Sequence, residues 1–409
     1  MSDVMKNAKE LIRKISHKFG VDVRRYPPAP LEKEVISLRP KDRFAGNALL
    51  SYISEPFLLK AGKPISNAHT HDWESYQIAR TFFDIGYSVD VVDYRNEAFV
   101  PLRPYSVFVG ARTNFERIAR LLDPNCTKIV HLDTAHWIFN NSASYKRLLD
   151  LQMRKGVTIP VTSLRQVESN LAIENADYAT LLGNEFTVGT YRYAHKPLFP
   201  MPISTCAMYP WPEDKDFDSC RRNFLWFGSG GLVHKGLDLV LDLFAEMKEC
   251  HLYVCGPIQQ EKEFDRLYHR ELYETPNIHT IGWVDVNSSE FTEITNKCIG
   301  LIYPSSSEGQ CGAVINCLHA GLIPIISYQS GVDISDFGLI LRDCSPEAIK
   351  DSLQRISGLP AEELRSMARK AWEFARANHT RERFGEAYKK VITQIVEVQR
   401  NRNKIAQRE

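Results

Sequence analysis

Two glycine-containing turns in the second half of the chain carry charged residues where an apolar strand is predicted to lead into a helix. The first, Gly228 to Gly231, follows the apolar run Asn223–Phe227 and precedes Lys235. The second follows another apolar run and contains Glu308. Glycines let a backbone approach a ligand closely, and helix N-termini present unpaired N–H groups to anions. Together with the lysine, these turns suit a ligand with a diphosphate centre and a hydroxyl-rich end, such as a nucleotide sugar.

Each turn also has a simpler interpretation. The spacing of the first turn matches neither a Walker A loop nor the GxGxxG dinucleotide fingerprint. Glu308 could cap the helix that follows it instead of gripping hydroxyl groups of a ligand. The residues alone leave these two roles of Glu308 open.

The two segments resemble the C-terminal half of retaining glycosyltransferases of the GT-B fold, in the large family 4 group (glycosyl transferases group 1). The resemblance is close from about Asn223 to the C-terminus and loose in the N-terminal half. It implies that Lys235 binds the donor pyrophosphate and acts in catalysis, and that Glu308 holds hydroxyl groups of the donor sugar. It also implies a donor-binding site made of Gly228, Ser229, Gly230, Gly231, Val284, Gly309, Gln310, Cys311, Gly312 and Asn316.

The sequence departs from the family pattern at two points in this donor site. Asn316 stands where the family has the second glutamate of its E-x7-E motif, and an asparagine can still hydrogen-bond a ribose hydroxyl. No arginine occupies residues 229–231, so a bidentate phosphate clamp is missing and Lys235 remains as a point charge. Val284 ends a segment that resembles the loop whose backbone reads the nucleobase, and a buried tryptophan after a strand is the alternative interpretation of that segment.

Polar residues also follow two predicted strands in the first half of the chain. Ligands of open parallel sheets bind beyond the carboxyl ends of the strands, so we place His69, His71, His131 and Asp133 on the acceptor side of the site. In the resembled family a histidine after the corresponding strand lies against the donor sugar and the acceptor. His136 is our candidate for this catalytic role, with His131 or Asp133 as alternatives. His69 and His71 have no third ligand at a useful spacing, and we predict no metal site.

Alternating strand and helix patterns predict an α/β protein with parallel sheets. The resemblance implies the GT-B arrangement, in which two Rossmann-like parallel-sheet domains face each other across a cleft. We predict strands at 47–53, 87–93, 105–109, 128–132, 157–161, 178–182, 223–227, 251–255, 277–281, 298–303, 322–326 and 338–341. The expected segments are a basic helix and tail (1–30), an acceptor-side domain (31–204), a linker (205–220), a nucleotide-sugar-binding domain (221–379), and a crossover helix with a tail (380–409).

The composition of the chain argues against several classes of protein. The 409 residues are 44% hydrophobic with a formal net charge of +1, which argues against a nucleic-acid partner. The sequence has no apolar run of the ~20 residues needed to span a bilayer and no signal peptide. Nine scattered cysteines without a C-x2-C pair predict reduced thiols and a cytoplasmic location.

Two charged segments have a functional and a structural interpretation each. Residues 1–26 predict a basic amphipathic helix, which could contact the inner membrane face or pack on its own domain. Asp214 and Asp216 form a nominal D-x-D motif, the kind that binds a metal–nucleotide complex in another glycosyltransferase fold. The motif lies in a proline-rich connector, and we interpret it as part of a solvated linker.

The resulting hypothesis is a metal-independent glycosyltransferase that moves a sugar, with retention, from a nucleotide-diphosphate sugar to an acceptor hydroxyl. The co-substrate is the nucleotide sugar, with no cofactor, and the acceptor is a glycan or a lipid-linked glycan. The family implies a role in surface or extracellular polysaccharide or glycolipid synthesis. Two alternatives are an inactive nucleotide-sugar-binding scaffold or sensor and a GT-B-fold nucleotide-sugar epimerase.

Overall fold

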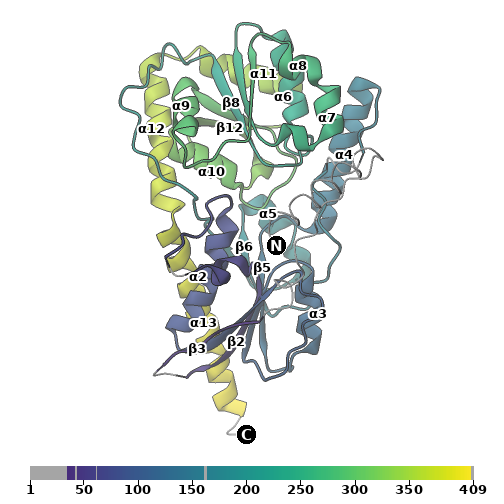
Figure 1. The fold of residues 1–409 in the computed structure, drawn as a ribbon, viewed down its shortest axis with the longest axis vertical. Helices are drawn as coiled ribbons and strands as arrows, with labels where there is room; N and C mark the ends of the chain where they lie inside the picture. Colours follow the sequence, from purple (N-terminus) through teal and green to yellow (C-terminus); the bar gives the residue numbers. More distant parts are fainter. Residues whose placement is uncertain (1–34, 42–43, 61, 161–163, 407–409) are drawn as a thin grey trace, which may run out of the picture.

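The apolar runs of the sequence fold into two parallel sheets, one in each half of the chain (Figure 1). The computed structural model describes residues 35–41, 44–60, 62–160 and 164–406, with side chains up to residue 401. The predicted helix of residues 1–26 and its tail to residue 30 lie outside the described residues. Within the described part, no helix has an apolar stretch long enough to cross a membrane.

The N-terminal sheet has seven strands in the order β1-β3-β2-β4-β5-β6-β7, and only β1 runs antiparallel to its neighbour. Its strand β3, which lies between β1 and β2, is buried along its whole length, as expected for a strand covered on both faces of the sheet. The strands are β1 (Ile36–Leu38), β2 (Gly46–Tyr52), β3 (Tyr87–Asp93), β4 (Val107–Gly110), β5 (Thr127–Leu132), β6 (Tyr178–Leu182) and β7 (Leu198–Met201). The helices are η2 (Glu55–Leu58), α2 (Thr70–Asp84), α3 (Asn114–Leu121), α4 (Trp137–Lys155), α5 (Glu185–Gly189) and η4 (Arg192–Ala194).

The C-terminal sheet has six parallel strands in the order β10-β9-β8-β11-β12-β13. They are β8 (Asn223–Phe227), β9 (His251–Cys255), β10 (Ile278–Gly282), β11 (Gly300–Tyr303), β12 (Ile323–Ser327) and β13 (Leu339–Leu341). The shorter helices are η5 (Ile258–Gln260), α7 (Lys262–Leu267), α8 (His269–Tyr273) and η6 (Tyr328–Ser330). The longer ones are α6 (Leu237–Glu246), α9 (Ser289–Lys297), α10 (Gly312–His319), α11 (Pro346–Ser357), α12 (Ala361–Asn378) and α13 (Arg381–Ala406).

The predicted strands agree with the observed ones to within two residues at each end, except in three regions. The short strand β1 was not predicted. Residues 157–160 form no strand, because Gly156 ends α4 in the left-handed conformation and Pro160 follows soon after. Strand β7 was not predicted, because Pro200 within it and the prolines nearby are unusual in a strand. A proline is compatible with β7, which is the edge strand of its sheet.

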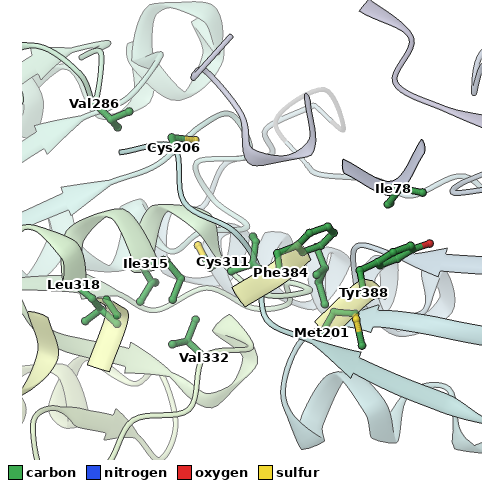
Figure 2. Packing of buried hydrophobic residues seen from close by; sticks show 14 of the residues in the cluster. Ile78, Met201, Cys206, Val286, Cys311, Ile315, Leu318, Val332, Phe384 and Tyr388 are labelled. Atoms are coloured by element: carbon green, nitrogen blue, oxygen red, sulfur yellow. The ribbon is translucent and has the colours of Figure 1, made fainter. Parts of the chain in front are cut away.

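A continuous apolar core joins the two domains (Figure 2). It contains Ile78 of α2, Met201 at the end of β7, Ile315 of α10, and Phe384 and Tyr388 of α13. Helix α13 follows α12 along one side of the molecule and packs against α2 and β7 (Figure 1). The domains are therefore joined by buried apolar contacts as well as by the connecting chain.

Helix α4 forms a second connection on the opposite side of the molecule (Figure 1). Its Leu151 is buried in the core of the C-terminal domain, and its Arg154 pairs with Asp238 and Asp242. Earlier in the helix, Ser144 Oγ lies 2.7 Å from His234 Nδ1. These contacts place the loop that follows α4 directly beside the C-terminal domain.

Four buried histidines make the stability of the protein sensitive to mild acid. Burial lowers the pKa of His131, His319 and His379 to about 4 and that of His234 to about 3. An unfolded histidine titrates near ~6.5, so between that pH and about 4 the unfolded chain binds protons that the folded chain excludes. We therefore expect the free energy of unfolding to fall as the pH drops through this window, by up to ~1.4 kcal/mol per pH unit for each histidine.

Urea unfolding at a series of pH values between 7 and 4.5 measures this slope. His319→Asn should reduce the dependence of the unfolding free energy on pH by up to ~1.4 kcal/mol per pH unit, which corresponds to one proton. His269 lies on the exposed surface of α8, so His269→Asn should leave this dependence unchanged. A stability that is flat from pH 7 to 5 would contradict the prediction.

Candidate active site

The carboxyl ends of strands from both sheets face each other across a cavity of about 310 Å³. The N-terminal domain contributes residues 66–71, which precede and begin α2, together with Asp133 and Arg165. The C-terminal domain and the connecting chain supply Ile203, Cys206, Phe227, Gly228, Ser229, Lys235, Trp283, Val284, Asp285, Val286, Asn287, Tyr303, Glu308, Gly309, Gln310, Cys311, Gly312, Ala313 and Asn316. Because ligands of parallel sheets bind beyond strand carboxyl ends, this cavity is the candidate active site.

Glu308 is the residue on which the charged and hydroxyl side chains of the cavity converge. Its Oε1 accepts hydrogen bonds from Lys235 Nζ (3.1 Å), Tyr303 Oη (3.1 Å) and Ser305 Oγ (3.0 Å). Its Oε2 pairs with the guanidinium of Arg165. The N-cap position of α10 is occupied by Cys311, three residues after Glu308, so Glu308 does not have the helix-capping role that the sequence left open.

Two cations keep the buried Glu308 carboxyl ionised. Burial by itself would raise its pKa, but Lys235 and Arg165 together hold the pKa of Glu308 well below the ordinary value. This cluster of one carboxylate and two cations has a net charge of +1, and only 4% of Glu308 is exposed. An anionic group of a ligand would neutralise this excess.

The glycine turn faces the cavity only at its beginning. Gly228 and Ser229 line the cavity, and a Cβ at position 228 would lie 3.2 Å from Lys235 Cδ, so glycine leaves space for the lysine. Gly230 and Gly231 do not line it. Instead, the Glu261 carboxylate accepts hydrogen bonds from the backbone N–H of Gly231 (2.5 Å) and of the next residue (3.2 Å). Of the predicted diphosphate cradle, the amide of Gly231 is therefore already paired with a carboxylate of the same domain, whereas Gly228 and Ser229 face the cavity.

The second turn lines the cavity along its whole predicted length, from Gly309 to Gly312, and Asn316 lies one helical turn beyond it. A Cβ at Gly309 would lie 2.4 Å from the carbonyl oxygen of Asp133, so only glycine fits where the two domains meet. Helix α10 begins at Gly312 without a side-chain cap. Its first N–H groups therefore remain available to an anionic ligand.

On the N-terminal side, His69, His71 and Asp133 line the cavity. The imidazole of His71 lies between two carboxylates: its Nδ1 is 3.0 Å from Glu74 Oε2, and its Nε2 is 3.7 Å from Asp133 Oδ2. Glu74 is fully buried and also accepts hydrogen bonds from the backbone N–H (2.9 Å) and the hydroxyl (2.8 Å) of Ser204. His71 is thus fixed in orientation at the cavity wall, where it can meet a hydroxyl group.

Asp133 is held in its charged form by Arg112, whose Nη2 lies 3.0 Å from Asp133 Oδ2. Against the effect of burial, this guanidinium keeps the pKa of Asp133 well below its ordinary value. The acceptor-side wall therefore carries a carboxylate.

His136 and His131 lie outside the cavity, which corrects the positions that we predicted for them. The ring of His136 caps α4 by accepting from Ile138 N (3.4 Å), and its Nε2 is 2.9 Å from Tyr193 Oη. Because α4 begins immediately after His136, the ring belongs to the helix end and faces a separate surface hollow. His131 is buried within its own domain, with Nδ1 2.9 Å from Thr180 Oγ1.

Three of the cavity residues that were not predicted as site residues bear on its chemistry. Tyr303 is the last residue of β11, and its place just before the second turn was an available signal. Trp283 was noted as a candidate buried residue, but 59% of it is exposed at the cavity. Arg165 belongs to no motif, and nothing in the sequence connects it to Glu308.

The D-x-D motif of the connecting chain lies away from the cavity. Lys215 between its two acids is buried and donates to the carbonyl of Thr295 (3.0 Å), while Asp216 accepts hydrogen bonds from the backbone N–H groups of residues 218 and 219. Both acids of the motif, Asp214 and Asp216, are exposed to solvent, as we predicted, while Lys215 between them anchors the turn to the C-terminal domain. Throughout the described part of the chain, no three His, Cys, Asp or Glu side chains are grouped so that they could hold a metal ion.

Residues 221–358 match the family model described as Glycosyl transferases group 1. The chain is similar in structure to sucrose-phosphate synthase from Thermosynechococcus elongatus, with a TM-score of 0.61 and 13% identity over 87% of this chain and 100% of that one. It is also similar to WaaG, a glycosyltransferase involved in lipopolysaccharide biosynthesis, with a TM-score of 0.52 and 15% identity over 85% of this chain and 99% of that one. The chain has the GT-B glycosyltransferase fold.

A variant of S. aureus TarM, in complex with fondaparinux, alpha-GlcNAc-glycerol and UDP, shares this GT-B fold with a TM-score of 0.50 and 10% identity. The match covers 72% of this chain but only 57% of TarM, so the chain spans little more than half the length of that protein. No curated protein sequence matches the chain. The GT-B cavity described above lies partly within the group 1 region, which contains Lys235 and Glu308.

Proposed function

We propose that the chain is a retaining glycosyltransferase that moves a sugar from a nucleotide-diphosphate sugar to an acceptor hydroxyl. The observation that carries the proposal is the buried Glu308 carboxylate, held by Lys235 between the facing ends of the two sheets. The matched family of residues 221–358 supports the reaction class. A structurally similar Anabaena protein was solved with UDP-glucose, which makes a nucleoside-diphosphate sugar the natural first donor to test.

In the proposed mechanism, the diphosphate of the donor binds near Lys235 and the start of α10. The bond between the anomeric carbon and the diphosphate breaks, and negative charge builds on the leaving diphosphate. Lys235 Nζ and the N–H groups of α10 stabilise that charge in a site that excludes most water. Glu308 binds sugar hydroxyl groups and so fixes the position of the anomeric carbon.

The acceptor hydroxyl is proposed to enter from the wall of His69, His71 and Asp133. It attacks on the face that the diphosphate leaves, which gives retention, and its proton passes to the departing diphosphate. The protein cations and N–H groups neutralise the diphosphate, so we propose a reaction that needs no metal or cofactor. The proposed acceptor is a glycan or a lipid-linked glycan. The reaction would take place on the cytoplasmic side of the membrane, in the synthesis of a surface or extracellular polysaccharide.

A thermal-shift panel of nucleoside diphosphates and their sugar conjugates tests the proposed donor. We expect one base to stabilise the protein, by about 2.7 kcal/mol when the free ligand is at 100 times its Kd. The matching sugar nucleotide is then incubated with protein, and the products are separated by chromatography and mass spectrometry. Release of nucleoside diphosphate with a glycosylated acceptor or free sugar is the expected result.

Two other outcomes would replace this function by a different one. Binding without any turnover indicates a nucleotide-sugar-binding scaffold or sensor. Conversion of the sugar nucleotide into another of the same mass indicates an epimerase. No stabilisation by any member of the panel would overturn nucleotide-sugar binding altogether.

A further inference from the structure

The donor side of the cavity lacks the positive groups that its glycine turn was expected to supply. No arginine occupies residues 229–231, and Glu261 already accepts the N–H group of Gly231. Lys235 is the one cation that the described C-terminal domain contributes to the cavity lining. A diphosphate in this cavity would need a second cation from elsewhere, because two phosphates carry more charge than one lysine neutralises.

Arg165 of the N-terminal domain lies against this incomplete turn. A Cβ on Gly231 would be 3.2 Å from the Cβ of Arg165, so the two backbones are in near contact. The segment is held there from α4, where Asn140 Nδ2 donates to the Arg165 carbonyl at 2.8 Å. From this position the Arg165 side chain extends into the cavity and pairs with Glu308, the same carboxylate that pairs with Lys235.

We propose that Arg165 is a donor-binding residue that supplies the second cation for the diphosphate, in place of the arginine missing from the glycine turn. The proposal rests on the proposed function. A planar guanidinium can donate two parallel hydrogen bonds to phosphate oxygens, which a lysine cannot. Before the donor binds, Glu308 is paired with both Lys235 and Arg165. When the donor binds, the two cations pair with the diphosphate instead, and Glu308 accepts hydrogen bonds from the sugar hydroxyl groups.

This assignment has a consequence for how the domains work together. Lys235 and Glu308 belong to the C-terminal domain, whereas Arg165 is attached to the N-terminal domain through α4. A diphosphate held by Lys235 and Arg165 therefore bridges the two domains. A nucleoside monophosphate has no second phosphate to share between the cations, and it should bind almost without help from Arg165.

The test compares diphosphate with monophosphate binding by calorimetry, using UDP and UMP, GDP and GMP, or ADP and AMP according to the base that wild type prefers. Arg165→Gln should weaken diphosphate binding by about 10–100-fold, the effect of losing a charge-assisted hydrogen bond, and should change monophosphate binding less than threefold. Arg165→Lys keeps the positive charge but cannot donate two parallel hydrogen bonds, so its diphosphate affinity should lie between those of wild type and Arg165→Gln. Turnover with the sugar nucleotide should decrease together with diphosphate affinity.

Arg95→Gln is the matched control, because Arg95 pairs with a buried carboxylate, that of Asp93, and neither residue lines the cavity. It should leave the ratio of diphosphate to monophosphate affinity unchanged. Equal losses for both ligands in Arg165→Gln, or no loss, would overturn the role of Arg165. That result differs from failure of the proposed function, in which wild type itself binds neither ligand. If Arg165→Gln does not fold, the result for Arg165→Lys decides: an unchanged ratio overturns the proposal, and a reduced ratio supports it.

Discussion

Replacing Lys235 by methionine should lower turnover with the sugar nucleotide by two to three orders of magnitude and leave the protein folded. Lys235 Nζ is buried beside Glu308, where a positive charge stabilises negative charge far better than it would in water. Losing one such contact to a leaving group typically costs ~2–4 kcal/mol of transition-state stabilisation. Methionine retains most of the volume of the lysine stem above Gly228, so packing changes little. Single-turnover kinetics with the donor found in the ligand panel would measure the effect.

The chain offers a matched control for this variant in Lys215. It is also a buried lysine, and it donates to a backbone carbonyl in the connecting chain away from the cavity. Lys215→Met should reduce stability, yet each folded molecule should turn over as fast as wild type. Near-wild-type turnover of Lys235→Met would contradict the proposed mechanism.

The strand pattern of the chain could be predicted because the strands are short buried runs. Every residue of β3 is buried, and β3, β6, β8 and β9 begin and end at the predicted residues. Edge strands are harder to recognise in a sequence, because one of their edges has no partner strand and the pattern of buried residues is weaker. For this reason β1 has a mixed burial pattern and β7 tolerates a proline, and neither was predicted.

The site residues that could be predicted are those whose reactive side chain and glycine turn belong to the same sequence motif. Lys235, Glu308 and Gly309 lie in the connections between a strand and the next helix, so the positions of the strands bring them to the same edge of the sheet. His136 shows the limit of this reasoning. It also follows a strand, but the next helix begins one residue later and uses its ring as a cap.

Residues that complete the site from a distance could not be predicted. Arg165 pairs with Glu308 across 143 positions of sequence, and no spacing rule links them. Glu261 takes the amides of the glycine turn from 30 positions away. Both contacts depend on how two separate segments are placed in space, which the composition of either segment leaves undetermined.

Replacing Glu308 by glutamine should separate its role in binding sugar from its role between the cations. The variant keeps the shape of the side chain but leaves Lys235 and Arg165 without their carboxylate, which should cost on the order of 3 kcal/mol of stability. A diphosphate restores the missing negative charge. We therefore expect the nucleoside diphosphate to raise the melting temperature of Glu308→Gln more than that of wild type, although transfer of the sugar falls at least ~100-fold.

Glu261→Gln is the control for this experiment, because Glu261 is also a partly buried carboxylate beside the glycine turn but accepts only backbone N–H groups. It should lower stability without enlarging the response to diphosphate. The depressed pKa keeps Glu308 ionised throughout the usual assay range, and its contribution to stability is lost only as the pH falls below ~4, the value for an unfolded glutamate. Melting curves at pH 7, with and without diphosphate, therefore compare a charged with an uncharged side chain. A contradicting result would be a Glu308→Gln variant that loses stability, is stabilised by diphosphate no more than wild type is, and still transfers sugar. In that case Glu308 only supports the fold, and Lys235 and Arg165 do not exchange its carboxylate for the diphosphate of a donor.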